Sequence, residues 1–269
     1  MVDIHCHVLP DVDDGPKRIK DSLDMLRNAL KTGVESVVAT PHLIENTFNI
    51  DVIGRDQVIY ELQNKAKKNG INIQIKAGYE CYISPEILEQ KVKLIELTIN
   101  TNGKYILVEL PMHSIPLYIE KTLLGLKDRG VTPVIAHPER NIVISKNPNV
   151  LLNFLAKGCV AQLNAGSILG YYGRVIRNTA RTLLLHNLVH LVASDMHSAT
   201  SPMMAQALPA ISALIGSDKA LYMFNVVPHR IVMGEDFDRY ELLPYEPKRR
   251  SLRDILFGNK ENSKVISNQ

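Results

Sequence analysis

The chain has few cysteines and no long apolar run, and each shortage excludes a class of protein. Cysteine occurs only at Cys6, Cys81 and Cys159 in 269 residues. Three scattered cysteines are too few for a disulfide framework or a four-thiolate zinc site, so we interpret them as buried thiols. No stretch approaches the roughly 18 uninterrupted apolar residues of a membrane span, and residues 1–5 do not open a signal peptide. We therefore expect a cytoplasmic protein with no membrane span.

The chain also has little excess charge. Its formal net charge is +3, far from the basic stripe of a nucleic-acid binder, so we expect no nucleic-acid partner. The one concentrated basic run, Lys248-Arg249-Arg250 with Arg253, lies near the C-terminus. We interpret it as a solvated segment, with contact to an acidic membrane surface or partner as the alternative.

Short apolar runs alternate with longer amphipathic segments along the chain. Four of these segments end in a glycine that leads directly into an apolar run, as helices commonly end, at Gly33, Gly70, Gly130 and Gly158. Strands that alternate with helices predict parallel pairing, and seven such units favour an α/β fold, a distorted (β/α)7 TIM-like barrel, over an open doubly wound sheet. The seven expected strands cover residues 2–5, 34–39, 71–77, 105–110, 132–136, 159–163 and 188–194.

The domain organisation follows from the same pattern. We expect the barrel to cover residues 1–234, because no linker interrupts the alternation before about Met233. Residues 235–258 are polar and rich in charge, and we expect them to form an extension packed on the barrel. Residues 259–269 are expected to be a disordered tail.

Side chains able to bind a metal ion follow six of the seven expected strands. Because the carboxyl ends of barrel strands converge on one rim, we expect these side chains to form one site. His5 and His7 are two residues apart and should face the same side of a strand, while Cys6 faces away. With Asp14 the nine groups suit two or three ions of zinc, manganese or iron, with a carboxylate such as Glu80 bridging. The nine are His5, His7, Asp14, His42, Glu80, Glu109, His137, Asp195 and His197.

The other arginine and histidine candidates differ from these nine in their expected roles. Arg140 lies three residues beyond His137 on the same rim, and its guanidinium would suit a pair of phosphate oxygens. The remaining histidines sit in no repeating pattern, and we interpret them as structural. They are His113, His186, His190 and His229.

At these residues the sequence resembles the polymerase and histidinol phosphatase (PHP) superfamily. It resembles most closely the bacterial branch of manganese-dependent protein-tyrosine phosphatases in capsule and exopolysaccharide regulation. The motifs that carry the resemblance run from the first expected strand to the seventh. They are Asp3-Ile4-His5-Cys6-His7, Asp13-Asp14-Gly15-Pro16, Thr40-Pro41-His42, Glu80, Glu109-Leu110-Pro111, residues 133–141 and Ala193-Ser194-Asp195-Met196-His197.

Carried over by position, the resemblance implies a trinuclear site with up to three ions, most simply manganese, with iron, zinc or magnesium as alternatives. It implies that Arg140 holds the phosphate. The ion sets it implies are His5, His7, Glu80 and Asp195 for the first; Glu80, Glu109 and His137 for the second; and Asp14, His42 and His197 for the third. Relatives usually carry a second arginine just after Asp-x-His, whereas residues 198–202 have none. Lys17 and Arg174 are the basic residues that could replace it.

The resemblance implies hydrolysis of phosphotyrosine by metal-activated water, with His42 or Asp14 as a possible acid when free of metal. The implied substrate is the tail of a membrane-associated tyrosine kinase. The sequence itself argues against a cysteine nucleophile, because no cysteine opens a Cys-x5-Arg loop; Cys81, for example, has Ile87 at the arginine position. The oligomeric state stays open.

Three alternatives remain at this point. One is a small-molecule phosphatase of the histidinol-phosphatase type. Another is an amidohydrolase, although that class usually needs a bridging lysine where Glu80 or Glu109 stands. The third is a non-catalytic module that binds phosphotyrosine or nucleic acid.

Overall fold

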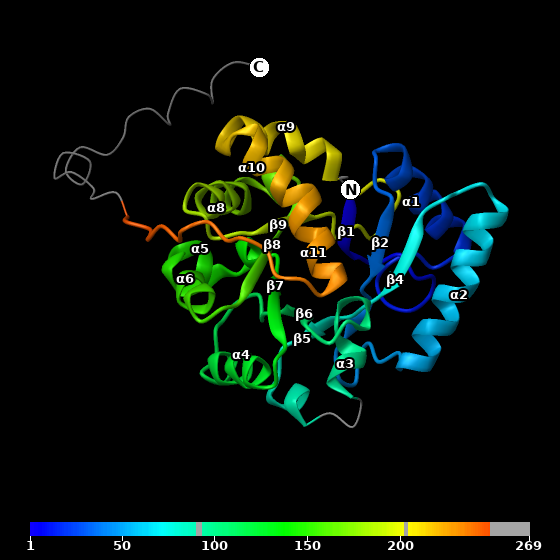
Figure 1. Cartoon of the computed structure of the whole chain (residues 1–269), viewed down its shortest axis with the longest axis horizontal. Coiled ribbons are helices and arrows are strands. Elements are labelled where there is room, and N and C mark those ends of the chain that lie inside the picture. The colour runs from blue at the N-terminus through cyan, green and yellow to red at the C-terminus, as the bar shows by residue number, and fades with distance from the viewer. Residues whose placement is uncertain (90–92, 202–203, 248–269) are drawn as a thin grey trace, which may run out of the picture.

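The computed structural model describes residues 1–89, 93–201 and 204–247 (Figure 1). The strands are β1 (Val2–Cys6), β2 (Ser36–Ala39), β3 (His42–Leu43), β4 (Gln74–Ala77), β5 (Glu80–Tyr82), β6 (Tyr105–Glu109), β7 (Thr132–Ala136), β8 (Val160–Asn164) and β9 (Leu191–Ala193). The α-helices are α1 (Ile19–Lys31), α2 (Val52–Lys68), α3 (Leu94–Leu97), α4 (Tyr118–Asp128), α5 (Ile142–Lys146), α6 (Asn149–Ala156), α7 (Ala165–Leu169), α8 (Arg174–Leu185), α9 (Met204–Ile215), α10 (Ser217–Leu221) and α11 (Val227–Met233). Short 3-10 turns are η1 (Pro85–Leu88), η2 (Ile99–Thr101) and η3 (Pro138–Arg140), and η4 (Tyr222–Val226) is a π-helical turn.

The strands form two parallel sheets that together make a distorted barrel. One sheet has the order β1-β2-β4 and the other β3-β5-β6-β7-β8-β9. Residues 40–41 connect β2 to β3, and residues 78–79 connect β4 to β5. At each of these two connections the chain passes from the three-stranded sheet into the six-stranded sheet. A parallel bridge between Cys6 and Met196 joins β1 to the segment after β9. Seven strand positions therefore succeed one another, and the predicted α/β TIM-like class is confirmed.

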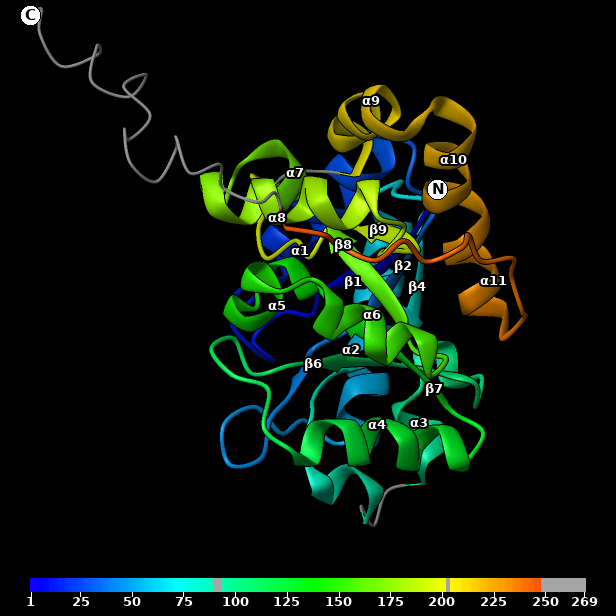
Figure 2. The same ribbon diagram turned by 90° about the vertical axis from the view of Figure 1, so that its left-hand side faces the viewer.

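The helices end where the sequence indicated. Gly33, Gly70, Gly130 and Gly158 each follow a helix and have positive φ between 70° and 92°. A residue with a Cβ is strained there, so glycine ends the helix and turns the chain into the next strand at little cost. Because the strands are parallel, each helix returns the chain to the end of the barrel where the next strand begins. The helices lie around the strands (Figures 1 and 2).

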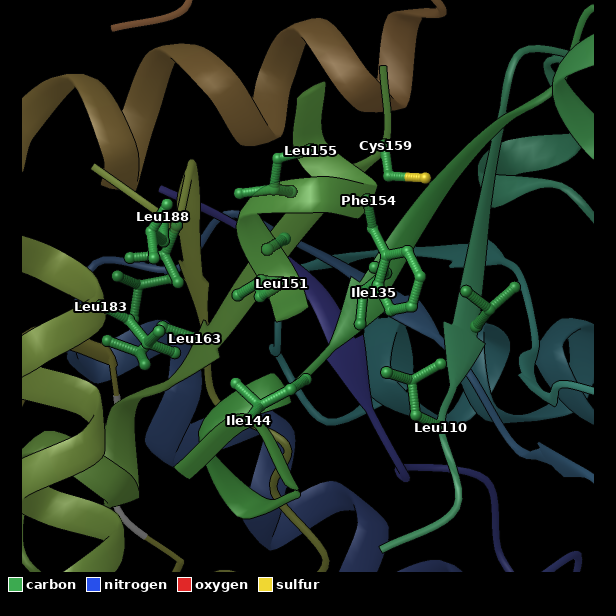
Figure 3. Packing of buried hydrophobic residues seen from close by; sticks show 14 of the residues in the cluster. Leu110, Ile135, Ile144, Leu151, Phe154, Leu155, Cys159, Leu163, Leu183 and Leu188 are labelled. Carbon is green, nitrogen blue, oxygen red and sulfur yellow. The ribbon is translucent and has the colours of Figure 1, made fainter. Parts of the chain in front are cut away.

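Two apolar layers hold the barrel together. The outer layer fills the space between the six-stranded sheet and its helices. There Ile135 of β7 lies beside Phe154 of α6, and Leu183 of α8 lies beside Leu163 of β8 (Figure 3). The inner layer fills the barrel interior, where Leu107 and Val134 meet Ile231 of α11. Asn102, just before β6, donates to the Ile231 carbonyl at 2.7 Å. Helix α11 thus closes the amino ends of the strands, and the opposite rim is left for polar groups.

The structure corrects several predicted boundaries. The predicted strand over 71–77 does not lead directly to Glu80, because β4 ends at Ala77 and Glu80 begins β5 in the other sheet. His42 likewise begins β3 instead of following the end of a strand. Strand ladders depend on partners distant in the sequence, which a local apolar pattern does not contain.

The described part of the C-terminal extension, residues 235–247, runs across the barrel without regular structure. Tyr105 Oη donates to the Glu235 carbonyl at 2.9 Å, and Arg239 Nη1 donates to the Cys159 carbonyl at 3.1 Å. The predicted remainder of the extension and the tail over 259–269 lie outside the described residues, as does the basic run from Lys248. Within the described ranges, no helix has the length and apolar character needed to cross a membrane.

Candidate metal centre

Three overlapping groups of ligand atoms meet at the carboxyl ends of the strands. The innermost group is fully buried and joins His5 and His7 of the first strand segment to Glu80 and Asp195. His5 Nε2 lies 3.2 Å from Glu80 Oε2 and 3.3 Å from Asp195 Oδ1. His7 Nε2 lies 3.2 Å and 3.4 Å from the same two oxygens. Two imidazoles and two carboxylates that point at one volume form a donor set suited to one divalent cation.

The second group shares Glu80 with the first. It joins His42, Glu80 and Glu109, with His42 Nδ1 3.1 Å from Glu80 Oε2. His137 approaches from the other side, and its Nε2 lies 2.8 Å from Glu80 Oε1 and 3.8 Å from Glu109 Oε1. The structure thus brings together the predicted set of Glu80, Glu109 and His137, and adds His42 to it. A carboxylate with both oxygens engaged in this way is placed to bridge two ions.

The third group lies at the rim and is open to solvent. It joins Asp14, His42 and His197, as predicted, and also His7. Asp14 Oδ1 lies 3.2 Å from His197 Nε2 and 3.5 Å from His42 Nε2. The side chain of Asp14 is 52% exposed and that of His197 is 31% exposed. A substrate would therefore reach the centre from this side.

Irregular backbone positions several of these side chains. The pairing of β1 with β2 shifts register between Asp3 and Cys6. As a result Ile4 packs in the barrel interior, whereas Cys6 packs in a separate apolar cluster that includes buried residues of α1. His137 and Asp195 have left-handed φ values of 30° and 52°. Strained non-glycine backbone and bulges concentrate at functional sites because they redirect single side chains.

The buried carboxylates create a strongly negative environment. Burial opposes protonation of His5, yet Glu80 and Asp195 raise the pKa of His5 to about 9. Burial raises the pKa of Glu109, and repulsion from the Glu80 carboxylate adds to it, so that the pKa reaches about 7. Histidines that gain protons beside crowded carboxylates mark a volume that attracts positive charge. A divalent cation would supply that charge in place of protons.

Two buried polar atoms at the centre of the site support the same interpretation. His42 Nδ1 and Glu80 Oε2 have no hydrogen-bond partner among the described residues. Buried polar atoms without a partner are costly and usually indicate a ligand or ion. The two atoms face each other at 3.1 Å, so a cation bound by both would satisfy them together.

Three polar residues outside the predicted ligand set hold two histidines and Asp195. Asp13 belongs to a motif that carries the resemblance, whereas Gln162 and Asn164 belong to none. Gln162 Oε1 lies 2.9 Å from His5 Nδ1 and accepts the backbone N–H of His137. Asn164 Nδ2 donates to Asp195 Oδ2 at 2.6 Å, and Asp13 Oδ2 lies 2.7 Å from His7 Nδ1.

These contacts fix which ring nitrogen of each histidine faces the site. An acceptor at Nδ1 keeps the proton on that nitrogen and leaves Nε2 free as a ligand. Gln162 and Asn164 lie on β8, which corresponds to the one expected strand that no metal-capable residue follows. Their polarity in an otherwise apolar run was the available signal.

The three basic residues predicted to bind phosphate lie at different places relative to the metal centre. Arg140 Nη1 donates to Asp195 Oδ2 at 3.1 Å, and its guanidinium lies 4.9 Å from the centre of the Tyr172 ring. Lys17 lies by the rim, where its Nζ donates to the Asp13 carbonyl at 2.5 Å. Arg174 is exposed at the first position of α8. Arg140 is thus the one of the three in direct contact with a predicted metal ligand.

Two curated relatives are tyrosine-protein phosphatases. YwqE of Bacillus subtilis (strain 168) is 36% identical over 198 residues, which cover 74% of this chain and 78% of YwqE. CpsB of Streptococcus pneumoniae is 32% identical over 242 residues, which cover 87% of this chain and 99% of CpsB.

Solved structures show the same relationship. A crystal structure from work on YwqE of Bacillus subtilis and CpsB of Streptococcus pneumoniae, described as unique metal-dependent tyrosine phosphatases, superposes with a TM-score of 0.87 at 31% identity. The match covers 92% of this chain and 100% of that one. Histidinol phosphate phosphatase of Lactococcus lactis shares the fold, with a TM-score of 0.54 at 15% identity over 83% of this chain and 94% of the enzyme.

A family model covers almost the whole barrel. It is described as "Capsular polysaccharide synthesis, CpsB/CapC" and matches residues 1–233. The match spans all nine predicted ligands and confirms the resemblance inferred from the motifs. The chain belongs to the CpsB/CapC family of capsular polysaccharide synthesis proteins.

Proposed function

We propose that this protein is a metal-dependent protein-tyrosine phosphatase that acts in the control of capsular or exopolysaccharide synthesis. The observation that carries the proposal is the convergence of nine imidazole and carboxylate groups, with Arg140 beside them, on one rim of the barrel. The family membership and the phosphatase relatives support the same reaction class, phosphoric monoester hydrolysis.

The donor set fits divalent cations, and we propose manganese, with up to three ions per chain. His5, His7, Glu80 and Asp195 would hold one ion. Glu80, Glu109 and His137 would hold a second, and Asp14, His42 and His197 a third. When bound, such cations lower the pKa of water toward neutrality and neutralise phosphoryl oxygens.

Basic side chains of the protein would bind the phosphate. Arg140 presents a guanidinium beside Asp195 and is placed to hold phosphoryl oxygens. Lys17 and Arg174 are the candidates for the second phosphate contact that relatives make with arginine. Of these, Lys17 already lies at the rim beside Asp13.

We propose that His42 and Asp14 act as metal ligands and not as proton donors. A hydrogen bond with His197 lowers the pKa of Asp14 to about 2, and burial lowers the pKa of His42. Both groups are therefore unprotonated at neutral pH, as ligands must be. A phenolate leaving group, with a pKa of about 10, departs with little protonation.

The cysteines are unsuited to nucleophilic catalysis. All three are buried as free thiols. Burial raises the pKa of Cys159 to about 11 and that of Cys6 well above its usual value. A buried thiol with a raised pKa supplies almost no thiolate at neutral pH. Hydrolysis by this protein therefore uses water instead of a covalent cysteine intermediate.

The open rim favours a protein substrate over a small molecule. Asp14 and His197 at the mouth of the site are partly exposed, so a side chain on a flexible tail can enter. We propose that the substrate is the phosphorylated tail of a membrane-associated tyrosine kinase.

The test compares hydrolysis of a phosphotyrosine peptide and of histidinol phosphate, side by side with manganese. We expect a higher kcat/KM on the peptide. A preference for histidinol phosphate would replace this proposal with a small-molecule phosphatase. Binding without turnover of either compound would indicate a non-catalytic module.

A further inference from the structure

Helix α8 carries a line of arginines on its exposed surface. Arg174, Arg177 and Arg181 are spaced three and four residues apart, so they lie on one side of the helix. All three are exposed, and none forms an ion pair with another residue in the described ranges. The buried residues of the helix, among them Ala180, Leu183 and Leu184, pack in the core. We name the line of three arginines the α8 ridge.

Within the described ranges, the elements that pack against α8 offer the α8 ridge no exposed carboxylate. Helix α8 contains no aspartate or glutamate, and neither do α5, α7 and α9, which pack against it (Figure 2). Of the elements in contact with α8, η3 contributes Glu139, but that side chain is fully buried and accepts from Asn164 and Ser167. The positive charge of the α8 ridge therefore faces solvent unopposed, in a protein whose net charge is only +3.

The α8 ridge begins beside the metal centre. Helix α8 packs against η3, the turn that ends in Arg140. The ring of Tyr172, two residues before Arg174, lies 4.9 Å from the Arg140 guanidinium. The chain thus leads from the phosphate-binding arginine through Tyr172 to the first arginine of the α8 ridge. Tyr171 and Val175, exposed at 64% and 68%, add apolar surface at this junction.

We propose that the α8 ridge binds acidic residues that flank the phosphotyrosine in the substrate peptide. This inference rests on the proposed phosphatase function and extends its site from the phosphate to the neighbouring peptide. The span from Arg174 to Arg181 is about 10 Å along the helix, from a rise of about 1.5 Å per residue, which is the reach of about three extended peptide residues. A peptide with its phosphotyrosine at the metal centre could therefore place two or three carboxylates along the α8 ridge.

The strength expected of these contacts is modest because the arginines are exposed. Each exposed ion pair contributes little, so loss of two arginines should weaken binding of an acidic peptide about fivefold. Attraction between exposed charges is screened by salt, with a Debye length of about 10 Å at 0.1 M ionic strength. The preference for acidic peptides should therefore shrink as salt is raised.

The test measures kcat and KM of the manganese-loaded full chain on two phosphotyrosine peptides. One has aspartate and glutamate around the phosphotyrosine, and the other has asparagine and glutamine at the same positions. We expect the wild-type protein to prefer the acidic peptide through a lower KM. In Arg177→Ala/Arg181→Ala the ratio of kcat/KM between acidic and neutral peptides should fall about fivefold, and high salt should reduce the wild-type ratio in the same direction.

Lys67→Ala/Lys68→Ala is the matched control, because it removes two exposed positive charges at the far end of α2. It should leave the ratio unchanged, and circular dichroism should show that both double variants fold. Equal losses on both peptides, or an unchanged ratio in Arg177→Ala/Arg181→Ala, would overturn the α8 ridge as a peptide site while leaving the phosphatase function intact. Loss of binding to phosphatidylserine vesicles with an unchanged ratio would assign the α8 ridge to a membrane surface instead. If the wild-type protein hydrolyses neither peptide, the phosphatase function itself fails.

Discussion

At the residue scale, the orientation of the ligands depends on polar side chains behind them. His5 is held through Nδ1 by Gln162, and Asp195 is held through Oδ2 by Asn164. Gln162 Nε2 also donates to Asn164 Oδ1 at 2.8 Å, which links the two supports to each other. A ligand fixed in this way loses little conformational entropy when an ion binds.

Gln162→Leu tests this role. The substitution keeps the volume of the side chain but removes the acceptor for His5 Nδ1, so His5 is free to rotate or to change tautomer. We expect manganese affinity to fall about 10- to 100-fold, measured by calorimetric titration of the metal-free protein. Gln74→Leu makes the same chemical change at an exposed position of β4 and should leave the affinity unchanged. Equal affinities in Gln162→Leu and wild type would show that His5 needs no such support.

The sequence located the nine predicted ligands but not these supports. Ligands could be predicted because metal-capable residues followed successive apolar runs, and carboxyl ends of barrel strands share one rim. The structure brings all nine together, although their ligation of metal stays a prediction. Gln162 and Asn164 could not be predicted as supports because amide side chains form hydrogen bonds in many settings. Only the fold shows that they contact His5 and Asp195.

At the element scale, the break between β4 and β5 places Glu80. Arg55 of α2 is fully buried beneath this break. Its guanidinium lies 4.5 Å from the centre of the Tyr79 ring, and its Nη1 donates to the Glu96 carbonyl at 3.0 Å. Tyr79 Oη donates to the Ile50 carbonyl at 3.1 Å. Arg55 and Tyr79 thereby tie α2 to the residue that precedes Glu80.

Arg55→Ala should destabilise the protein by roughly 3 kcal/mol, because it removes the donor to the partly buried Glu96 carbonyl and the packing on Tyr79. Urea unfolding followed by circular dichroism measures the loss. Arg55→Lys retains the charge and part of the side-chain volume, so it should cost less. If Arg55→Ala unfolds at the wild-type urea concentration, the contacts with Tyr79 and Glu96 do not stabilise the fold.

The predicted strands were placed correctly in order but not at their ends. Gly33 and Gly130 marked helix ends because positive φ favours glycine, a local property that a sequence displays. The transfer of chain from one sheet to the other before His42 and Glu80 is set by pairing between segments far apart in sequence. The register shift near Cys6 also depends on pairing between distant segments, so no local sequence pattern predicts it.

At the scale of the whole molecule, the described extension lies near a buried histidine at the amino end of β9. His190 Nδ1 accepts the Ala161 backbone N–H at 3.2 Å, and its ring faces Phe237 of the extension. Burial, with a smaller contribution from the positive charge of Arg239, lowers the pKa of His190 to about 3. The folded protein therefore holds this histidine neutral.

Stability should accordingly fall in acid. The pKa of His190 is about 6.5 in the unfolded chain and about 3 in the folded protein, so between these pH values only the unfolded chain binds a proton at His190. The contribution of neutral His190 to the free energy of unfolding is therefore complete above pH 6.5 and is lost as pH falls. The slope within this window approaches about 1.4 kcal/mol per pH unit. His190→Asn retains an acceptor for Ala161 and removes the titration. As pH is lowered from 7 to 5, the free energy of unfolding of His190→Asn should rise by roughly 2 kcal/mol relative to that of the wild type, measured by urea unfolding. A difference between the two proteins that is the same at both pH values would contradict the buried neutral histidine.

The metal dependence of activity is the most direct test of the account, and one experiment measures it. Aryl phosphate hydrolysis is followed for the wild-type protein and His137→Ala, before chelation, after chelation and after manganese is returned, with metal content determined in parallel. We predict that chelated wild type loses hydrolysis and regains it with bound manganese. His137→Ala should stay inactive while its circular dichroism spectrum remains that of a folded barrel. Full activity in metal-free wild-type protein would contradict the account.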